Sequence, residues 1–266
     1  ATVSGAQAVV FVTASPYLRQ TLKQFLPLLP DDVSILNATK GLEEGSHKTM
    51  VELYKELLTP AQLDRWALLS GPNLSLELAQ GLPTTTVIAA ARFSVAQYFQ
   101  ALFNAGILRV YTNDDVIGVQ LAGTLKNVMA LAAGILEGLG LGYNARAGLL
   151  VRGLAEMTRL GVAMGARAST FYGLSGLGDL ICTCSPLSRN YSVGLRIGKG
   201  EGLTEVLAGM VSVAEGITTA KVAQKLALQH KIDVPIINGV CAILFSGASP
   251  ATVAGQLMQR EPKSES

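Results

Sequence analysis

The stretch Ala8-Val-Val-Phe-Val-Thr13 is a continuous apolar run, and a helical pattern over residues 17–28 and a second apolar run over residues 33–38 follow it. Strands in which apolar and polar residues do not alternate are typical of a sheet that is covered on both faces. Such strands, joined by helices, are typical of a largely parallel α/β sheet. The opening of the chain therefore predicts an α/β fold whose ligands lie off the carboxyl ends of the strands.

The alternation of strands and helices continues to about Asn113 and then stops. Before that point we expect further strands at residues 66–70, 84–90 and 107–111, and helices at residues 47–58, 74–80 and 94–104. After it we expect a long helix capped by Asp114 or Asp115 and ending near residue 138, then helices at residues 144–165, 193–197, 204–207, 218–230 and 236–245. The sequence thus predicts an α/β unit over residues 1–113, an all-helical unit over residues 114–259 and a polar tail over residues 260–266.

The composition of the chain excludes several classes of protein. With 266 residues, 49% of them hydrophobic and only 15% charged, the chain can bury a large core and is not a disordered tail. Its net charge of +2, without a run of Lys or Arg, gives a nucleic acid nothing to bind. In the longest uncharged run, residues 234–259, the strongly apolar part covers only residues 236–248, which is too short to span a bilayer of about 30 Å. We therefore expect no membrane insertion.

The cysteines indicate a reduced, cytoplasmic protein. There are three of them and no signal peptide, which does not fit a disulfide framework. Cys182 and Cys184 could form half of a metal site, but the chain has only two histidines and no second cysteine pair. We expect inert thiols and no metal site.

Lys126 is an isolated charge on the first long helix. It is the only charged residue between Asp115 and Glu137, and the residues three and four positions away are Ala, Gly and Met, so no carboxylate on the helix neutralises it. Such a lysine can extend past small residues to water, or it can point into a cleft where loss of water lowers its pKa and suits it to proton transfer. The residues alone leave both alternatives open.

Four other segments place polar groups where a ligand could lie. Lys40 follows the second expected strand and Ser70-Gly-Pro-Asn73 follows the third, so both lie at carboxyl ends of strands. Ser188-Arg-Asn190 offers a hydroxyl, a guanidinium and an amide, a combination that suits a phosphate monoester. Asp179 follows Gly176 and Gly178, and it can serve such a site or simply cap a helix. Taken singly, each of the other three segments is more typical of a plain turn or a solvated loop.

Taken together and in order, these segments resemble the bacterial-type NAD(P)-dependent glycerol-3-phosphate dehydrogenases. The resemblance runs from near Val9 to about Phe245. It implies a Rossmann-like parallel sheet followed by an all-helical domain, NAD or NADP as cofactor, and a small phosphorylated three-carbon substrate, and it allows a homodimer. The family reversibly reduces dihydroxyacetone phosphate to sn-glycerol 3-phosphate, which supplies the backbone of phospholipids. The matching segments are Ala38-Thr-Lys-Gly41, Ser70-Gly-Pro72, Leu125-Lys-Asn-Val128, Asn144-Ala-Arg-Ala147, Arg152-Gly-Leu-Ala-Glu156, Gly176-Leu-Gly-Asp-Leu180, Thr183-Cys184 and Ser188-Arg-Asn190.

The resemblance also implies roles for single residues. Lys126 matches the lysine that donates a proton to the carbonyl oxygen while hydride arrives from the nicotinamide. Lys40 matches a lysine that contacts substrate and cofactor, and Arg189 matches an arginine that binds substrate and reaches the cofactor phosphates. The other residues expected to contact substrate are Gly71, Asn73, Asp179, Thr183, Ser188 and Asn190, and those expected to contact cofactor are Ser75, Val213 and Glu215.

The cofactor-binding turn of the family does not occur in this sequence. The family begins with a strand, a Gly-x-Gly-x-x-Gly turn and a helix that holds the pyrophosphate, whereas Gly138-Leu-Gly140 and Gly176-Leu-Gly178 lie in the helical half without a preceding strand. We expect the sheet to be N-terminally incomplete, lacking about two strand-helix units or roughly 60–80 residues. The alternatives are another two-domain hydroxyacid or sugar-phosphate dehydrogenase, or, for this chain as it stands, a catalytically incomplete fragment.

Overall fold

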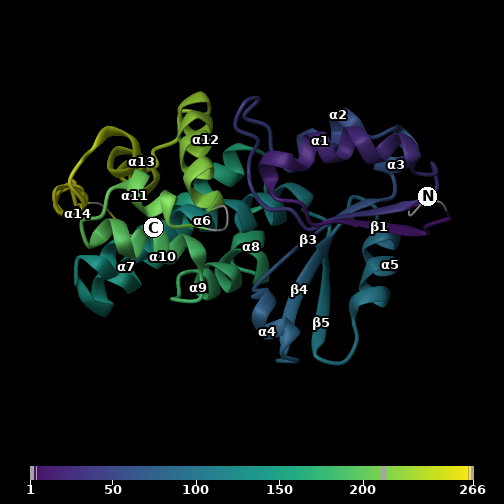
Figure 1. Cartoon of the computed structure of the whole chain (residues 1–266), viewed down its shortest axis with the longest axis horizontal. Helices are drawn as coiled ribbons and strands as arrows, with labels where there is room; N and C mark the ends of the chain where they lie inside the picture. The colour runs from purple at the N-terminus through teal and green to yellow at the C-terminus, as the bar shows by residue number, and fades with distance from the viewer. Residues whose placement is uncertain (1–2, 4, 211–213, 263, 265–266) are drawn as a thin grey trace.

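The computed structural model consists of a sheet with its covering helices and a helical half, which lie side by side along the long axis of the molecule (Figure 1). It describes residue 3 and residues 5–210, 214–262 and 264. The last strand ends at Asn113, and every described element beyond that residue is helical. The predicted fold class, a Rossmann-like α/β sheet followed by helices, is therefore confirmed. The division of the chain into domains at residue 113 remains a proposal.

The sheet is mixed, with one reversal of strand direction. Its strands are, in spatial order, β1 (Ala8–Phe11), β2 (Ser34–Asn37), β3 (Trp66–Ser70), β4 (Thr84–Ala89) and β5 (Leu108–Asn113). All neighbouring pairs are parallel except β3 and β4, which are antiparallel. Between these two strands lies only the five-residue helix α4 (Ser75–Ala79), which is too short to return the chain for a parallel pairing. The carboxyl ends of β1, β2 and β3 therefore share one edge, and those of β4 and β5 lie at the opposite edge.

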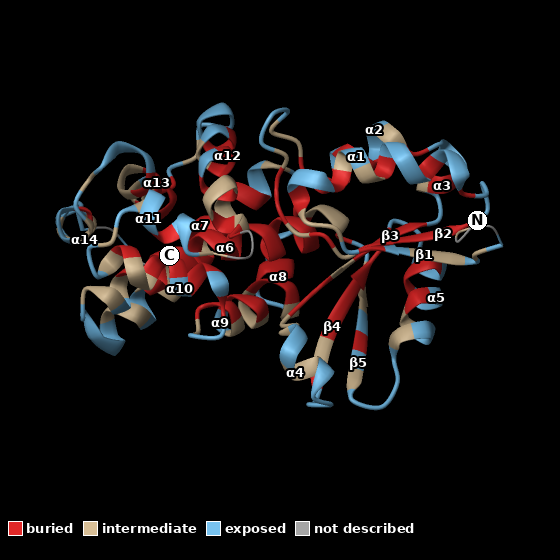
Figure 2. Ribbon diagram, in the orientation of Figure 1, coloured by how far each residue is buried: buried red, intermediate tan, exposed pale blue. Residues whose placement is uncertain are grey.

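Helices cover both faces of the sheet, as the continuous apolar strands predicted. The helices of this half are α1 (Ser15–Phe25), α2 (Met50–Leu57), α3 (Pro60–Leu63), the short α4 and α5 (Phe93–Phe103). On one face α1 and α2 bury Leu22 and Tyr54 against Ile35. On the other face α5 buries Phe99 against Leu36. Adjacent residues of β2 thus point into two different cores, and the central strands β2, β3 and β4 are largely buried (Figure 2).

The helical half is built around one central helix. Its helices are α6 (Val116–Gly138), α7 (Gly142–Ala163), α8 (Ala168–Phe171), α9 (Asp179–Thr183), α10 (Arg189–Gly198), α11 (Leu203–Ala208), α12 (Glu215–Gln229), α13 (Pro235–Ser246) and α14 (Pro250–Met258). Asp115 caps α6, because its carboxylate accepts the backbone N–H of Gly118 at 2.9 Å. By length and composition α6 could cross a membrane, but 89% of its apolar stretch is buried inside the protein, which is typical of a core helix.

Glycines let α10 approach α6 backbone to backbone. A Cβ atom on Gly134 of α6 would lie 2.1 Å from the carbonyl oxygen of Tyr191, and a Cβ on Gly194 of α10 would lie 2.1 Å from that of Leu131. No side chain fits at such distances, so this crossing requires glycine at both positions. The glycine-rich composition of the helical half has here a specific structural cause.

Several boundaries differ from the sequence prediction. Helix α10 begins at Arg189 and not at residue 193, because the Ser188 side chain accepts the N–H of Tyr191 and caps it. Helix α14 was not predicted: Gly247, in the left-handed conformation with φ 70°, ends α13, and a new helix begins at Pro250. Helices α3, α8 and α9 were also missed, since elements of four or five residues carry no readable periodicity.

A buried carboxylate joins α7 to α13. Glu156 is 1% exposed, and its two carboxylate oxygens accept the backbone N–H groups of Ile236 at 2.9 Å and Ile237 at 2.8 Å, in the first turn of α13. A carboxylate at this place satisfies N–H groups that have no partner within the helix. Burial nevertheless raises the pKa of Glu156 to about 7, against the opposing effect of these two hydrogen bonds.

We predict that Gly134→Ala destabilises the protein by about 2–3 kcal/mol, because the new methyl group would overlap the backbone of α10. Gly148→Ala on the exposed side of α7 is the matched control. A Cβ atom on Gly148 would meet nothing within 4 Å, so the higher helix propensity of alanine should leave the protein equally or slightly more stable. Urea unfolding of the two variants measures both effects, and equal stability would contradict the tight crossing.

We further predict that part of the stability depends on the protonation of Glu156. Its pKa is raised in the folded state from 4.5 to about 7, so the folded protein binds more protons than the unfolded chain in this window. The free energy of unfolding should therefore fall by about 2 kcal/mol as the pH rises from about 4.5 to about 7. Unfolding measured across this range should show a smaller fall for Glu156→Gln, which does not titrate, and the wild-type fall for the exposed control Glu205→Gln.

Candidate active site

One buried carboxylate binds two lysines that come from opposite halves of the molecule. The Asp179 side chain is 2% exposed, and its Oδ1 accepts the Lys126 ammonium at 2.7 Å while its Oδ2 accepts the Lys40 ammonium at 2.6 Å. Thr183 completes the group: its hydroxyl accepts from Lys126 Nζ and donates to Asp179 Oδ1. The Lys40 ammonium also donates to the carbonyl oxygen of Gly71 at 3.2 Å. These five predicted site residues therefore lie together.

Three different elements place these groups. Lys126 extends from the middle of α6 and is 6% exposed, so the alternative in which it extends to water is wrong. Lys40 lies in the loop after β2, at the carboxyl edge where ligands were expected. Asp179 is the first residue of α9, directly after the π-helical turn Leu174–Gly178. Asp179 therefore lies in this cluster, and its side chain does not cap a helix.

Burial and charge act in opposite directions on these ionisable groups. Burial, and then the nearby charge of Lys40, lower the pKa of Lys126 from 10.5 to about 8, although Asp179 acts to raise it. Burial alone would raise the pKa of Asp179, but the charges of Lys40 and Lys126 hold it below its ordinary value. The site thus places an ionised carboxylate next to an ammonium group with a pKa of about 8.

A second group of predicted residues lies where α10 and α12 begin. Asn190 Oδ1 accepts the backbone N–H of Gly216 at 3.0 Å, which links the two helices. A Cβ atom on Gly216 would lie 2.7 Å from the carbonyl oxygen of Asn127, the neighbour of Lys126. Ser188 is buried as the cap of α10, while Arg189, its first residue, is exposed. The structure therefore places the Ser188–Asn190 segment next to the helix that carries Lys126.

Glu215 links this second group to the sheet half. Burial raises the pKa of Glu215, while a hydrogen bond from the backbone of Ser15 and the charge of Arg189 oppose that rise. Ser15 is the first residue of α1 and was not singled out in the sequence, where only its place before Pro16 hinted at a helix start. Val213, also expected to contact cofactor, lies outside the described residues.

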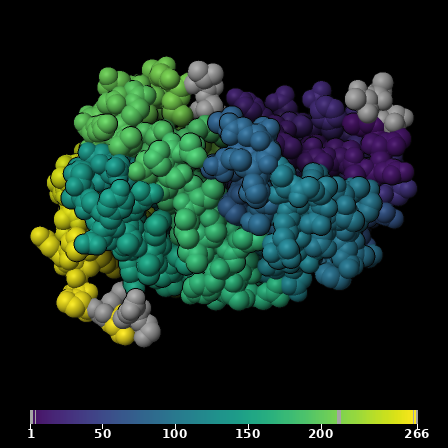
Figure 3. Space-filling model, turned by 90° about the horizontal axis from the view of Figure 1, so that it is seen from below, coloured from purple at the N-terminus to yellow at the C-terminus, as the bar shows by residue number. Residues whose placement is uncertain are grey.

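The turn after β3 lies against the helical half. In the space-filling view, the blue segment that includes α4 touches the green helices (Figure 3), and a Cβ atom on Gly178 would lie 3.8 Å from Pro72. The Asn73 side chain, however, bonds to β4, at the carbonyl of Thr85 and the hydroxyl of Thr86. Ser75 is exposed at the start of α4. Their substrate and cofactor contacts stay predictions, and those of Asn73 would be made by its backbone.

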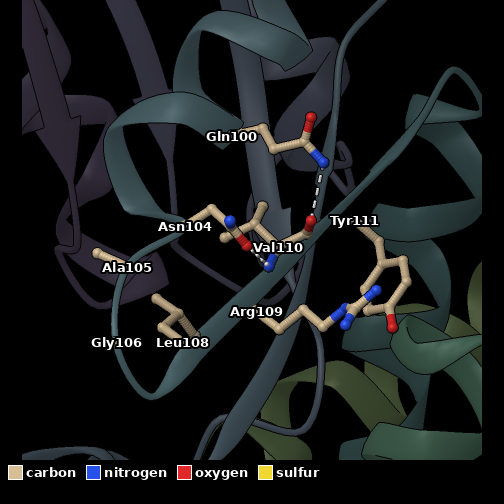
Figure 4. Close-up of a pocket in the computed structure, with 8 residues that line it drawn as sticks. All are labelled: Gln100, Asn104, Ala105, Gly106, Leu108, Arg109, Val110 and Tyr111. Carbon is tan, nitrogen blue, oxygen red and sulfur yellow. Dashed lines mark hydrogen bonds between the residues drawn. The ribbon is translucent and has the colours of Figure 1, made fainter.

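Cavities elsewhere contain none of the predicted site residues. A cavity of about 510 Å³ lies beside β5, where Gln100 and Asn104 bond to the backbone of Val110 and Arg109 packs on Tyr111 (Figure 4). An apolar cavity of about 1270 Å³ lies between α7, α13 and α14. Among the described residues, no group of three or more His, Cys, Asp or Glu side chains could hold a metal ion, and the cysteines are free thiols.

The arrangement can perform proton transfer next to an anionic ligand. A buried ammonium with a lowered pKa is suited to general acid–base catalysis, and the cations Lys40 and Arg189 provide groups that bind phosphate. At the carboxyl edge of a Rossmann-like sheet, this chemistry is typical of two-domain nicotinamide-dependent dehydrogenases.

Comparisons with known proteins define the family. The model of the NAD-dependent glycerol-3-phosphate dehydrogenase N-terminus matches residues 1–96, and that of the C-terminus matches residues 115–255. The glycerol-3-phosphate dehydrogenase (NAD(P)+) of Geobacter metallireducens is 47% identical over 263 residues, which cover 98% of this chain and 78% of the relative. That of Syntrophotalea carbinolica is also 47% identical, over 98% of this chain and 79% of the relative. The chain belongs to the NAD-dependent glycerol-3-phosphate dehydrogenase family and is an oxidoreductase.

Solved structures agree with this assignment. The crystal structure of glycerol-3-phosphate dehydrogenase from Coxiella burnetii has a TM-score of 0.91 and 34% identity, and the match covers 97% of this chain and 78% of that one. A D-mandelate dehydrogenase with NADH matches with a TM-score of 0.56 at 9% identity, over 93% of this chain and 77% of that one, which shows a shared fold alone. The predicted family, fold and NAD or NADP cofactor are therefore confirmed.

We predict that Asp179→Asn lowers the pKa of Lys126 further below its value of about 8, because the carboxylate that favours the charged lysine is removed. The titration of the Lys126 Cε chemical shift by NMR, assigned with Lys126→Met, measures the change. Asp64→Asn is the control, since Asp64 pairs with Arg92 at the surface and its removal should leave the titration unchanged. An unaltered Lys126 titration in Asp179→Asn would contradict the shared carboxylate.

Proposed function

We propose that this chain interconverts dihydroxyacetone phosphate and sn-glycerol 3-phosphate with NAD(P), and so supplies glycerol phosphate for phospholipid synthesis. The observation that carries the proposal is the buried cluster in which Lys126 and Lys40 bind the two oxygens of Asp179. The relatives support it too, because the Geobacter metallireducens protein that matches 98% of this chain is named glycerol-3-phosphate dehydrogenase (NAD(P)+).

In this proposal Lys126 is the general acid of carbonyl reduction. The chemistry that a bound NADH or NADPH supplies is hydride transfer to the carbonyl carbon. The Lys126 ammonium donates a proton to the carbonyl oxygen in the same step and becomes a neutral amine. With a pKa of about 8, that amine takes up a proton from water again near neutral pH. In the reverse direction the neutral amine is the base.

Asp179 and Thr183 hold the acid in place. Asp179 keeps the Lys126 ammonium charged despite its burial, and the Thr183 hydroxyl fixes the direction of Nζ. Lys40 lies at the edge of the cluster, with its side chain 21% exposed, where it can bind the substrate. We infer that Gly71, Asn73, Ser188, Arg189 and Asn190 form the rest of the substrate site.

For the cofactor, the residues present fit the nicotinamide end better than the pyrophosphate. The buried carboxyl group of Glu215 senses the charges of Arg189, Lys40 and Lys126, which indicates that these three cations lie near it. We infer that Lys40, Arg189 and Glu215, with Ser75 and Val213, contact the cofactor, and that Arg189 reaches its phosphates. No Gly-x-Gly-x-x-Gly turn occurs in the sequence to cradle the pyrophosphate. The chain spans about four-fifths of the length of its curated relatives.

The cellular setting is also part of the proposal. We infer a cytoplasmic protein that inserts into no membrane and binds no nucleic acid, in keeping with its three free thiols and its small net charge. We propose a homodimer formed by the helical half, because large apolar side chains remain exposed there. These side chains are Leu141, Tyr143, Val151 and Met258.

We predict that dihydroxyacetone phosphate causes oxidation of NADH or NADPH, and that Lys126→Ala lowers kcat by about 10²–10⁴-fold because the proton donor is lost. The wild-type rate of reduction should also fall as the pH rises through about 8, where Lys126 loses its proton. The exposed Lys55→Ala is the control, and circular dichroism checks that both variants fold.

The assay is run on this chain and on a form extended ahead of Ala1 by about two strand-helix units that include a Gly-x-Gly-x-x-Gly turn. Near-normal turnover of Lys126→Ala would remove Lys126 as the acid. Activity with a hydroxyacid or another sugar phosphate, and none with dihydroxyacetone phosphate, would favour the related two-domain dehydrogenases. Activity of the extended form alone would identify this chain as a catalytically incomplete fragment.

A further inference from the structure

The loop that carries Lys40 is bound to the same helix that carries Lys126. Gly41, the residue after Lys40, donates its backbone N–H to Thr124 Oγ1 at 3.2 Å. Its carbonyl oxygen accepts Gln120 Nε2 at 3.3 Å and lies 3.5 Å from Thr124 Oγ1. Thr124 is fully buried, and Gln120 is 4% exposed. Both backbone polar groups of Gly41, its N–H and its carbonyl, are therefore bonded to α6.

The hydrogen-bonding capacity of Thr124 is completely used at this contact. Its hydroxyl accepts from Gly41 N and from Gln120 Nε2 at 3.2 Å, and it has one proton to donate, toward the Gly41 carbonyl. Gln120 contributes only its Nε2, since its Oε1 is buried without a partner among the described residues. A buried acceptor without a partner is unfavourable, so the stabilising contact of the Gln120 side chain is the hydrogen bond that its Nε2 donates to the loop.

The backbone of Gly41 restricts the loop further. Its φ of +125° is a conformation that residues with a Cβ rarely adopt. A Cβ atom there would also lie 2.7 Å from Ser15 Oγ, at the start of α1. The loop is therefore confined between α1 and α6, and its position relative to α6 is set by the Thr124 and Gln120 bonds.

Next to this contact, α6 also meets the Lys40 side chain itself. A Cβ atom on Gly123 would lie 3.8 Å from Lys40 Cε and 2.2 Å from Ser70 Oγ, so the small residue leaves room for both. A single helix, α6, thus determines where both lysines lie, through its residues 120, 123, 124 and 126. If the backbone at Gly41 moved along α6, the distance between the Lys40 and Lys126 ammonium groups that bind Asp179 would change.

We propose that Thr124 and Gln120 are positioning residues for the reaction: they fix the Lys40 loop to α6 and so hold the Lys40 ammonium at Asp179 opposite Lys126. They touch neither the reacting atoms nor the cofactor, and they act through Lys40. The inference rests on the proposed dehydrogenase function for its kinetic consequence. The effect of Thr124 and Gln120 on the surroundings of Lys126 can be measured without turnover.

The ionisable groups near Lys126 make this effect measurable. Lys40 and Lys126 share the carboxylate of Asp179, and Cys182 of α9 lies close enough to act on Lys126. Lys126 in turn acts on Cys184 and Glu215. Among them only Lys40 adds positive charge, and it acts to lower the pKa of Lys126. If the loop loosens, that charge moves away and water enters, and both changes raise the pKa of Lys126.

The first test uses Thr124→Val, which replaces the hydroxyl by a methyl group of similar size, and Thr124→Ser, which keeps the hydroxyl. We expect Thr124→Val to lower kcat/KM for dihydroxyacetone phosphate roughly 10- to 100-fold, because the misplaced ammonium binds the reacting substrate less well. Thr124→Ser should restore most of the rate. Thr158→Val on α7, which removes only a hydroxyl bonded to Leu154 of its own helix, is the matched control and should match wild type.

The second test reads the site without turnover. In an NMR titration of Lys126 Cε, Thr124→Val should raise the pKa of Lys126 by about one pH unit, and Thr124→Ser and Thr158→Val should not. Lys40→Met should raise it too. In the Lys40→Met background, Thr124→Val should add little, since the two changes act through the same ammonium. A variant that was merely less stable would leave this pKa unchanged.

The two tests separate the possible failures. If wild type does not oxidise NAD(P)H with dihydroxyacetone phosphate, the proposed function fails, while the titration still decides the role of Thr124. If wild type is active and Thr124→Val keeps both the wild-type kcat/KM and the wild-type pKa of Lys126, the positioning role is wrong. Additive effects of Thr124→Val and Lys40→Met on that pKa would also overturn it. Gln120→Leu, which loses only the Nε2 bonds, should show a weaker change in the same direction.

Discussion

The buried carboxylate of Asp179 is the group on which the rest of the site depends. Removing a charge from water has a large free-energy cost unless opposite charges replace the lost hydration. Here the compensation comes from Lys126 of the helical half and Lys40 of the sheet half, one on each carboxylate oxygen. The three groups are stable in the interior only when the two halves lie together, so the ion pairs of the site also join the halves of the molecule.

Helix α6 supplies the frame for this arrangement. Its residues from Gly118 to Ile135 are all buried, and α7, α9, α10, α12 and α13 pack around it. Small residues admit the neighbouring backbones on one side and the Lys40 loop on another. Because almost every other position of the helix is apolar, the single ammonium of Lys126 has no alternative partner on α6 and must be neutralised from other elements.

Much of the fold could be predicted because it follows from local patterns. The five strands have short apolar runs, and the helices α6 and α7 have much longer helical patterns, so length together with pattern separates the two kinds of element. The antiparallel step from β3 to β4 and the short helices α8 and α9 could not be predicted in this way, because they depend on connection length and packing. Serine and glycine are common at helix ends, so the caps at Ser188 and Gly247 could have been proposed from the sequence. Only the three-dimensional contacts distinguish them from the many similar residues of the chain.

The sequence by itself determined that Lys126 is an isolated charge, that Lys40 and Gly71 follow strands, and that these segments occur in the order of one enzyme family. Those facts depend on neighbours along the chain. Only the tertiary structure decided that Lys126 is buried, that Asp179 binds two lysines, and that Thr124 and Gln120 hold the Lys40 loop. Residues 40, 124 and 179 are far apart in the chain, so their chemistry appears only when packing brings them within hydrogen-bond distance.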